Sequence, residues 1–409
     1  MKGSANMSVI GVVCEYNPFH NGHEYHLMMT RRQLGEDAPA ICVMSGDFVQ
    51  RGEAAVYSKA ARAEAACRCG ADLVVELPLP WSLASAEGFA RGAVSLLGSL
   101  GATHLSFGSE AGETEPLENI ARTLLDPAVT ADVKRLLSED GSRSFAAARQ
   151  LAVEARLGEP GQQLELPNNI LAVEYLKAIY ELRLDLIPMT VQRFGSGHDA
   201  PGGGGAPRSA ADIRRMLANG KSTERDMPAA AAAVYRRERM LGRELSDRSL
   251  LETALLSRLR MFDERYYNAL PDALDGLGNR LYRAAHEEAS LDAVLAAAKT
   301  KRYALSRLRR MCLCAGLGVK AGMSAELPPY ARVLAANARG CELLRGISQK
   351  KNIPVVNKPA SVRDLSPECV SLFAMGAYAH DFYVLGYKAA AERKGGEDWK
   401  TGPIIVNNL

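Results

Sequence analysis

Two histidines three positions apart are the side chains of this sequence best placed to do chemistry. His20 and His23 lie on either side of Gly22, and imidazole rings donate hydrogen bonds and exchange protons near neutral pH. A helix is expected over residues 24–34, and its first turn would add backbone N–H groups and partial positive charge. The glycine would let a phosphate approach the backbone closely. We therefore interpret this turn as a phosphate site, against the simpler alternative of two surface histidines in a loop.

The elements around this turn predict a parallel sheet that would hold the histidines at its edge. Residues 9–13 form an apolar, β-branched run typical of a buried parallel strand, and the run breaks at Asn17-Pro18. Further strands are expected at 38–44, 72–77, 103–107 and 184–191, separated by helical segments at 58–69, 83–100 and 171–182. This alternation predicts an α/β fold with a Rossmann-like, doubly wound parallel sheet. Such sheets bind ligands at the carboxyl ends of their strands, where the histidines lie.

Polar clusters follow other predicted strands and are candidate ligand loops. Residues 45–53, which include Arg51, follow the second strand, and Gly108 follows the fourth. Ser58 is expected to cap the next helix. Lys59 in its first turn would either bind an anion or be exposed, since cations usually prefer the other end of a helix. These positions extend the predicted phosphate site along the edge of the sheet.

Two further segments carry hydrogen-bond donors suited to a nucleotide. Asn168 and Asn169 open a helix, and a capping role would explain one of them but not both. Arg193 follows the fifth strand. Ser209 is expected to cap a helix that carries Arg214. A capped helix start beside two arginines would make a second phosphate cradle.

Length and composition describe a multidomain protein without a membrane-spanning segment. The 409 residues exceed one ordinary domain, and 47% hydrophobic with 24% charged residues are typical of soluble globular proteins. No apolar run reaches the length of a membrane span and the N-terminus lacks a signal-peptide core, so a cytoplasmic location is expected. The eight cysteines are scattered, which suits reduced thiols rather than disulfides or a zinc site. We interpret Cys14 as core packing rather than a nucleophile.

The two parts of the chain differ in charge. Residues 1–225 carry 22 Lys+Arg against 27 Asp+Glu, hence −5, whereas residues 226–409 carry 28 against 20, hence +8. Such asymmetry is a hint that one part binds nucleic acid. We therefore predict a nucleotide-binding domain at residues 8–225, with a helical insertion at about 113–165, followed by a mainly α-helical, basic domain at residues 226–409.

A basic stretch in the second half is a candidate RNA-binding surface. Five basic residues lie within residues 300–310, and the candidates for RNA contact are Lys301, Arg302, Tyr303, Arg307 and Arg310. Cationic side chains bind RNA phosphates and an aromatic ring can stack on a base. A solvated basic helix face explains the same residues equally well. Helical periodicity runs through 281–317, a further helix is expected to start at 328–334, and short strand-like runs occur at 353–356 and 404–406.

The residues around the histidines resemble a known family. His20 to His23 are similar to the signature of the HxGH nucleotidyltransferase superfamily, and the helix start at 209–214 resembles its second motif. Longer strings extend the resemblance to the bacterial tRNA(Met) cytidine acetate ligase family, from residue 9 to about residue 360. These strings are residues 15–23, 44–53, 107–110, 167–171, 197–199, 300–303, 329–334 and 353–356, and they occur in family order. The resemblance implies a fold of the HxGH nucleotidyltransferase type.

The resemblance also implies an ATP-dependent ligase that modifies tRNA in two steps. Acetate would attack the α-phosphate of ATP to give acetyl-adenylate, and the wobble cytidine of elongator tRNA(Met) would then take the acetyl group to become N4-acetylcytidine. His20 and His23 would be catalytic, ATP would enter with Mg²⁺, and the anticodon arm would lie on the basic domain. By family correspondence the ATP-binding residues would be Val13, Cys14, Glu15, Tyr16, Asn17, Pro18, Phe19, His20, Asn21, Gly22, His23, Glu24, Tyr25, His26, Gly108, Asn168 and Arg193. Possible further phosphate or substrate contacts are Arg51, Lys59, Asn169, Ser209 and Arg214.

Two other functions fit part of the sequence. A cofactor adenylyltransferase would share the nucleotide site but would not need the basic second half. A non-catalytic RNA-binding protein with a retained nucleotide pocket would keep the fold. Four candidate site residues argue against lost catalysis, namely His20, His23, Asn168 and Arg193. Acetate and tRNA(Met) as substrates follow only from the resemblance, and the sequence leaves the oligomeric state open. Formation of acetyl-adenylate by the purified protein would separate these functions.

Overall fold

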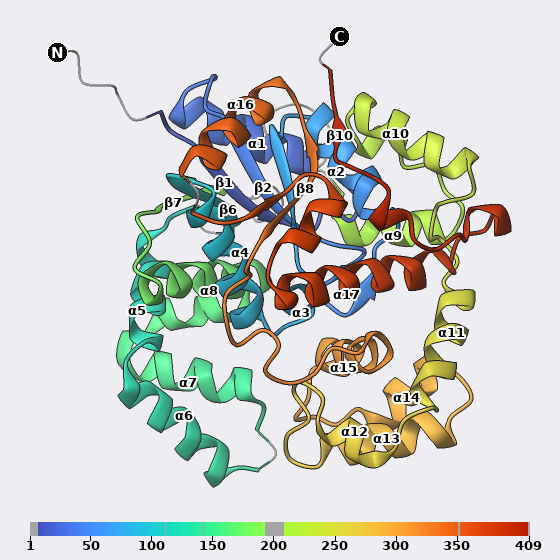
Figure 1. Ribbon diagram of the computed structural model, residues 1–409. Helices are drawn as coiled ribbons and strands as arrows, with labels where there is room; N and C mark the ends of the chain where they lie inside the picture. Colours follow the sequence, from blue (N-terminus) through green and yellow to red (C-terminus); the bar gives the residue numbers. More distant parts are fainter. Residues whose placement is uncertain (1–6, 111, 142, 193–207, 351, 408–409) are drawn as a thin grey trace.

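A mostly parallel sheet lies at the centre of the computed structural model (Figure 1). The structure describes residues 7–110, 112–141, 143–192, 208–350 and 352–407. The strand order is β10-β8-β5-β2-β1-β6-β7, and β9 pairs with β8. The strands of the sheet are β1 (Ile10–Cys14), β2 (Ala40–Ser45), β5 (Leu73–Leu77), β6 (His104–Ser109), β7 (Ile187–Gln192), β8 (Ala331–Ala336), β9 (Val355–Val356) and β10 (Ile404–Ile405). A separate antiparallel hairpin consists of β3 (Phe48–Val49) and β4 (Glu53–Ala54).

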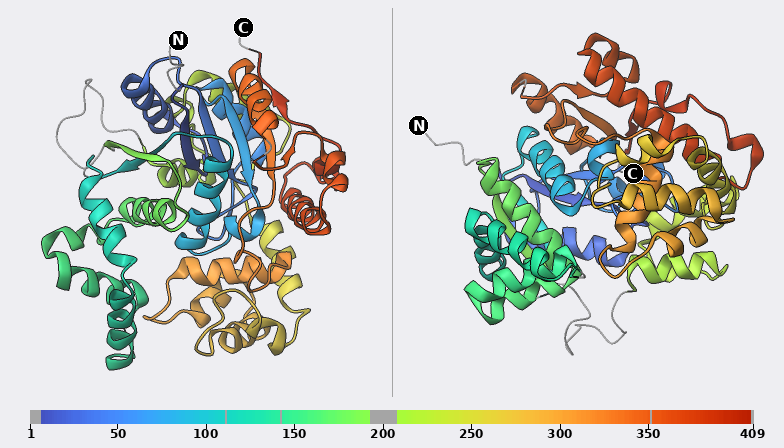
Figure 2. Two further views of the ribbon diagram at one scale, coloured as in Figure 1. Left: turned by 60° about the vertical axis from the view of Figure 1, so that its left-hand side comes forward. Right: turned by 90° about the horizontal axis from the view of Figure 1, so that it is seen from below.

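Helices cover both faces of the sheet and form two outlying groups (Figures 1 and 2). The first half contains α1 (Asn21–Leu34), α2 (Lys59–Arg68), α3 (Leu79–Ser82), α4 (Ala86–Ser99), α5 (Glu115–Leu124), α6 (Pro127–Glu139), α7 (Phe145–Leu157), α8 (Pro167–Glu181) and α9 (Ala210–Ala218). The second half contains α10 (Ala229–Met240), α11 (Ser249–Leu259), α12 (Glu264–Asn268), α13 (Leu277–Glu287), α14 (Leu291–Ala298), α15 (Leu305–Leu317), α16 (Ala338–Lys350) and α17 (Pro367–Val384). Short 3₁₀ helices are η1 (Glu159–Glu165), η2 (Glu224–Asp226), η3 (Pro359–Asp364), η4 (Ala390–Glu392) and η5 (Glu397–Trp399). The expected helical insertion at about 113–165 is present as α5, α6, α7 and η1.

The strand side chains alternate between two hydrophobic cores, one on each face of the sheet. Ile41 and Val43 of β2 pack in the core that includes α4 and α8. Cys42 and Met44 of the same strand pack in the opposite core, with residues of α1 and α2. Because both faces are covered, β2 and β5 are buried along their whole length. The pairing of β1 with β2 and β6, of β2 with β5 and of β6 with β7 is parallel, so the predicted α/β fold is confirmed.

The second half of the chain returns to the sheet and completes it. β8 pairs antiparallel with β5, while β9 and β10 pair in parallel with β8. The prediction of a helix starting at 328–334 is wrong, because residues 331–336 form the buried strand β8. Periodicity in a short apolar run does not distinguish a buried strand from a helix, and the neighbouring strand decided the outcome. The sheet takes strands from both 8–225 and 226–409, and the domain boundary between these ranges stays a prediction.

Helices α11 to α15 enclose a third core below the sheet in the view of Figure 1. The predicted helical run at 281–317 is divided into α13, α14 and α15. The basic stretch at 300–310 therefore begins in a loop and enters a helix only at its middle. In the described ranges no helix is long and apolar enough to cross a membrane. The His, Cys, Asp and Glu side chains of these same ranges form no group of three that could hold a metal ion.

Candidate active site

The turn between β1 and α1 places the two histidines side by side at the start of a helix. His20 is the N-cap of α1, and its Nδ1 accepts the N–H of Gly22 at 3.0 Å. His23 Nδ1 accepts the N–H of His20 at 3.2 Å, so the two residues form a reciprocal capping box. Their rings stack with centroids 3.8 Å apart. The pair therefore has a structural role at the helix start, whatever chemistry it also performs.

These capping contacts determine where each neutral imidazole carries its proton. Because Nδ1 of His20 and Nδ1 of His23 each accept a backbone N–H, the neutral rings carry the proton on Nε2. Each ring is thus a hydrogen-bond donor through Nε2, and the first turn of α1 adds partial positive charge beside them. Two imidazole donors at a helix start are well suited to the oxygen atoms of a phosphate.

The residues around the histidines hold the rings in place. A Cβ added to Gly22 would lie 2.9 Å from Cε1 of His20, so a larger residue would displace that ring. Phe19 is fully buried, and its N–H donates to the hydroxyl of Tyr235 at 2.9 Å. The ring of Tyr16 packs edge-on against Phe19 with centroids 4.8 Å apart. The glycine and the aromatic anchors explain why this local sequence gives one defined turn.

The other side of the first helix lies against β6. Nε2 of His26 lies 2.9 Å from the hydroxyl of Ser106, and the hydroxyl of Thr30 lies 2.7 Å from the same oxygen. Gly108 is two residues farther along the strand and so lies on the same face of the sheet as Ser106. Gly108 has no side chain, so it adds no bulk to this face of the strand. Gly108 thus lies just beyond the point where β6 contacts α1, and its part in the nucleotide site stays a prediction.

The predicted amide pair ties the start of α8 to the end of β6. Asn168 donates from Nδ2 to Oε1 of Glu110 at 2.6 Å. Asn169 accepts the N–H of Glu110 at 3.4 Å and donates to the carbonyl of Gln163 at 3.2 Å. The expected capping role is wrong, because the N-cap of α8 is Leu166 and no side chain caps it. The buried Asn169 fixes the backbone, whereas the half-buried Asn168 lies at the edge of the site.

The second predicted phosphate motif contacts the first. Ser209 caps α9 as predicted and accepts the N–H of Asp212 at 3.2 Å. Arg214 donates from Nη1 to the carbonyl of Asn17 at 2.9 Å. Burial lowers the pKa of the Arg214 guanidinium. Arg193, predicted for the same site, lies outside the described residues.

The β3–β4 hairpin lies between the histidine turn and the C-terminal helices. The N–H of Gln50 donates to Oε1 of Glu15 at 3.0 Å, and burial raises the pKa of that carboxyl. Gly52 has a positive φ of 76°, and a Cβ there would lie 2.5 Å from the backbone nitrogen of Arg310. The hairpin therefore packs directly on α15. Arg51, at the tip of the hairpin, is exposed.

Sequence reasoning missed Arg62, which organises the loops under the site. This side chain is fully buried, and its guanidinium donates to the carbonyl of Ser45 at 3.2 Å and of Tyr57 at 2.9 Å. Further bonds reach the carbonyls of Glu15 and Gly46. Arg62 thus joins the ends of β1 and β2, so we assign it a positioning role. The available signal was a large cation in the middle of a helix that is otherwise rich in alanine.

Lys59 lies in a buried ion cluster rather than at an exposed helix start. Its Nζ is 2.9 Å from Oε1 of Glu76 and 2.5 Å from Oδ2 of Asp398. Arg332 contacts the same two carboxylates at 3.1 and 2.7 Å. Burial alone would lower the pKa of Lys59, but the Asp398 and Glu76 carboxylates raise it above its ordinary value. These contacts hold Lys59 among protein groups, and a phosphate contact by Lys59 stays a prediction.

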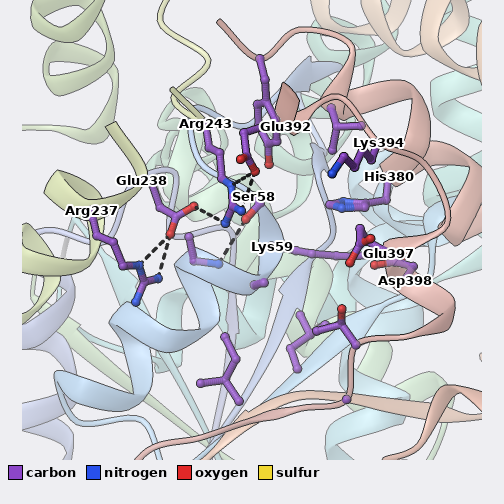
Figure 3. A pocket seen from close by; sticks show the side chains of 18 of the residues that line it. Ser58, Lys59, Arg237, Glu238, Arg243, His380, Glu392, Lys394, Glu397 and Asp398 are labelled. Atoms are coloured by element: carbon purple, nitrogen blue, oxygen red, sulfur yellow. Dashed lines mark hydrogen bonds and ion pairs between the residues drawn. The ribbon is translucent and has the colours of Figure 1, made fainter. Parts of the chain in front are cut away.

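A polar pocket of about 440 Å³ lies over this ion cluster (Figure 3). It is lined by the start of α2, the end of α10, α17 and the C-terminal segment. Nδ1 of His380 lies 2.8 Å from Oδ2 of Asp47, and Oδ1 of Asp47 accepts the N–H of Lys59 at 2.7 Å. At the opposite wall Arg237 pairs with Glu238 at 2.8 Å. Cations and carboxylates thus compensate each other, so the pocket carries no marked preference for an anion.

The predicted RNA-binding residues differ in exposure. Tyr303 and Arg310 are buried, with 7% and 8% of their surface exposed. The guanidinium of Arg307 lies 4.9 Å from the centroid of the Tyr303 ring. Lys301 is exposed and Arg302 is partly exposed. Lys301 and Arg302 are therefore the members of this group best placed to meet an RNA phosphate, and RNA contact by all five residues stays a prediction.

Cys14, which ends β1, packs in the core. Its thiol lies 3.7 Å from the carbonyl of Val43, and burial is the main cause that raises its pKa well above the ordinary value. A thiolate is the reactive form of cysteine. Cys14 is thus a packing residue in this fold and is not activated as a nucleophile.

The chain is similar to nucleotidyl transferases and to one named ligase along nearly its whole length. A family model described as HIGH Nucleotidyl Transferase matches residues 7–398. A tRNA(Met) cytidine acetate ligase of Acetivibrio thermocellus is 34% identical over 98% of this chain and 100% of its own. A protein of the same name from Caldicellulosiruptor saccharolyticus is 37% identical over 93% of this chain and 95% of its own.

Two solved structures share the fold of this chain. The crystal structure of apo Thermotoga maritima TmcAL matches with a TM-score of 0.91 and 31% identity, and covers 98% of this chain and 100% of that chain. The crystal structure of the same protein bound with alpha-thio ATP matches with a TM-score of 0.90, with the same identity and coverage. The agreement extends over both the sheet and the outlying helices, because nearly all residues of both chains are covered.

Proposed function

The chain belongs to the tRNA(Met) cytidine acetate ligase family within the HIGH nucleotidyl transferases, and on this premise we propose how its site works. It is an ATP-dependent ligase, and its substrates are ATP, acetate and tRNA(Met). We place the triphosphate of ATP at the turn between β1 and α1. The observation that carries this proposal is the reciprocal capping box, which commits both Nδ1 atoms to the backbone and makes both Nε2 atoms donors.

In the first step an acetate oxygen attacks the α-phosphorus of ATP. The bond from this phosphorus to the bridging oxygen breaks, and pyrophosphate leaves with the electron pair. Nε2–H groups of His20 and His23 stabilise the negative charge that grows on the phosphate oxygens. Arg214, already bonded to the turn at Asn17, meets the leaving pyrophosphate. Such a reaction depends on positioning and charge neutralisation, so no enzyme nucleophile is required.

The nucleoside part of ATP lies along the rest of the predicted site, residues 13–26 with the end of β6. The sheet surface at Gly108, where β6 carries no side chain, accommodates it. The amide of Asn168, at the edge of this surface, hydrogen-bonds the ribose or a phosphate. Arg193 completes the site by family correspondence. Mg²⁺ enters as part of the ATP substrate, carried by its phosphates.

An open groove of about 720 Å³ beside the basic stretch supports an RNA site on the C-terminal helices. Its cationic lining residues are Arg280, Arg283, Lys301 and Arg302. Two carboxylates, of Asp275 and Glu287, oppose them, so the groove keeps surplus positive charge. We assign the backbone of the tRNA(Met) anticodon arm to this groove. Its tRNA substrate places the protein in the cytoplasm.

In the second step the N4 amine of the wobble cytidine attacks the acetyl carbonyl carbon of acetyl-adenylate. The bond from that carbon to the AMP oxygen breaks, AMP leaves with the electron pair, and the amine loses a proton. The product is N4-acetylcytidine. The target base has to leave its stack to reach the adenylate, as is general for enzymes that act on a base.

A transfer assay tests this function directly. Purified protein is incubated with ATP, labelled acetate and tRNA(Met) transcript, and the nucleosides are analysed. Label in acetylcytidine that disappears without ATP is the expected result. Labelled acetyl-adenylate without labelled RNA would contradict the RNA assignment and favour another acceptor. If the folded protein forms neither acetyl-adenylate nor acetylcytidine, a non-catalytic binder is favoured. Transfer of AMP to a cofactor precursor would favour an adenylyltransferase.

A further inference from the structure

A second cationic cluster lies between the nucleotide site and the C-terminal helices, around Glu53. Nη1 of Arg309 is 2.6 Å from Oε1 of Glu53, and Nη1 of Arg248 is 3.6 Å from Oε2. Nη2 of Arg214 is 3.9 Å from the same Oε2. The neighbouring Arg51 is close enough to lower the pKa of Arg214 electrostatically, after the larger effect of burial. Three guanidinium groups thus lie within 3.9 Å of the Glu53 carboxylate, and we call these four side chains the Glu53 cluster.

One side chain, that of Arg214, joins the Glu53 cluster to the proposed adenylate site. Arg214 reaches Glu53 with one guanidinium nitrogen and the carbonyl of Asn17 with another, at 2.9 Å. The same hairpin that carries Glu53 contacts Glu15 through the N–H of Gln50. An anion held by the cluster would therefore lie beside the bound acetyl-adenylate, on the side of α11 and α15.

A small hollow of about 90 Å³ adjoins the Glu53 cluster, between the hairpin and α11, α14 and α15. Its walls are mainly apolar and include Phe48, Leu251, Leu255, Leu291, Leu295 and Leu313. Polar groups lie at its rim, namely the guanidinium groups of Arg248 and Arg309 and the carboxylates of Glu252 and Asp292. Burial raises the pKa of the Glu252 carboxyl, and the nearby Asp292 raises it further. The hollow thus combines apolar walls with cations and carboxylates at one opening.

We propose that the Glu53 cluster and this hollow together hold the RNA nucleotide that accepts the acetyl group. This assignment rests on the proposed function and extends it. A nucleotide has a phosphate, which guanidinium groups bind well, and a flat base whose faces favour apolar walls. The exocyclic amine of cytosine donates hydrogen bonds, and the rim carboxylates of Glu252 and Asp292 accept them.

Guanidinium groups at the rim beside apolar walls favour a ligand that has both a phosphate and a flat base over a purely apolar or purely cationic ligand. The alternative source of the same phosphate chemistry is the triphosphate of ATP, which Arg214 also approaches. Arg248 and Arg309 distinguish the two sources, because Arg248 is the N-cap of α11 and Arg309 lies on α15, whereas Arg214 is the arginine of the cluster that bonds to the histidine turn at Asn17. If the phosphate belongs to RNA, these two arginines affect acetyl transfer and leave adenylate formation unchanged.

The test uses two variants of the full chain and one matched control. Arg248→Gln removes a cation from the Glu53 cluster, and Leu291→Trp fills the hollow from the half-exposed first residue of α14. Arg265→Gln removes the same charge from an exposed position on α12. Acetate-dependent ATP–pyrophosphate exchange measures the first step, and labelled acetyl transfer to tRNA(Met) transcript measures the second. Thermal unfolding checks that each variant is folded.

We expect both variants to keep exchange within about twofold of the unsubstituted protein, while the KM for tRNA rises. In Arg248→Gln the rise should be about tenfold or more, as for a lost bond to a charged group. In Leu291→Trp the KM rises because the indole occupies the space of the base. Arg265→Gln should change neither the exchange rate nor the KM for tRNA. Normal transfer by folded Leu291→Trp or by folded Arg248→Gln would overturn the assignment. A raised KM for ATP with reduced exchange in Arg248→Gln would assign the cluster to the triphosphate instead. Absence of exchange and transfer in the unsubstituted protein would refute the proposed function itself.

Discussion

Replacing His20 with asparagine separates the two roles that this residue has in our proposal. Asparagine is among the best N-cap residues, so its side-chain oxygen can replace Nδ1 as acceptor for the N–H of Gly22. Its side chain is shorter than that of histidine, so its Nδ2 amide does not reach the position of the Nε2 donor. From capping alone we expect the free energy of unfolding to change by less than about 0.5 kcal/mol. Adenylate formation should fall by about 100- to 1000-fold, which corresponds to about 2.7–4 kcal/mol of lost transition-state stabilisation.

A second variant and a control complete this experiment. His20→Ala removes the cap as well as the donor, so it should cost about 1 kcal/mol more in stability than His20→Asn. Both variants remove the stacking on His23, whose ring centroid is 3.8 Å away, so this loss cancels in the comparison between them. Ser144→Ala removes the N-cap of α7, where the hydroxyl accepts the N–H of Ala147 at 3.2 Å, and should destabilise by about 1 kcal/mol without affecting activity.

Urea unfolding gives the stabilities, and acetate-dependent ATP–pyrophosphate exchange gives the activities. The decisive comparison is between His20→Asn and the unsubstituted protein. If His20→Asn keeps exchange within about threefold, the Nε2 donor contributes far less than a donor to a developing anion should. The histidine would then be a helix cap and nothing more, and the phosphate assignment of the turn would be refuted.

Three further changes test other parts of the structure. Burial alone would lower the pKa of His380, but the Asp47 carboxylate raises it above the ordinary value of 6.5. The protonated His380 therefore stabilises the folded protein fully below pH 6.5, and this contribution is lost as pH rises through the higher folded pKa. His380→Gln should therefore flatten the decline of thermal stability above pH 6.5, and an unchanged slope would contradict this linkage. Lys59→Met should cost about 3 kcal/mol in urea unfolding, since it leaves buried carboxylates short of one cation; a loss below about 1 kcal/mol would count against the ion cluster. Replacing Lys301 and Arg302 by Gln should weaken tRNA binding and reduce the salt slope by about 1 to 2, whereas unchanged affinity would identify a solvated face.

The parts of the fold that were predictable from sequence depend on neighbours along the chain. The capping roles of Ser58 and Ser209 are confirmed, because an N-cap bond spans only three residues. The expected cap from Asn168 or Asn169 is wrong, because Glu110 and Gln163 take up their side-chain amides. Those partners were not visible in a local pattern.

The course of the chain after residue 226 shows the same limit. Residues 331–336 have a short apolar pattern that fits helix or strand, and only the edge of β5 selected the strand. The basic stretch at 300–310 was read as one surface, yet packing turned Tyr303 and Arg310 inward. Exposure of a side chain depends on which element covers it, and sequence alone does not specify that element.

By itself, the sequence determined the alternating α/β order, the strand–turn–helix that carries His20 and His23, and the family. These features follow from periodicity and from contacts within a few residues, which a single chain segment encodes. Only the tertiary structure decided that Arg214, Arg248 and Arg309 meet at Glu53 beside an apolar hollow. Their separation along the chain is large, and each is an ordinary surface arginine in its own segment. Their convergence exists because the hairpin packs on α15 without a side chain at Gly52 and α9 closes on the histidine turn.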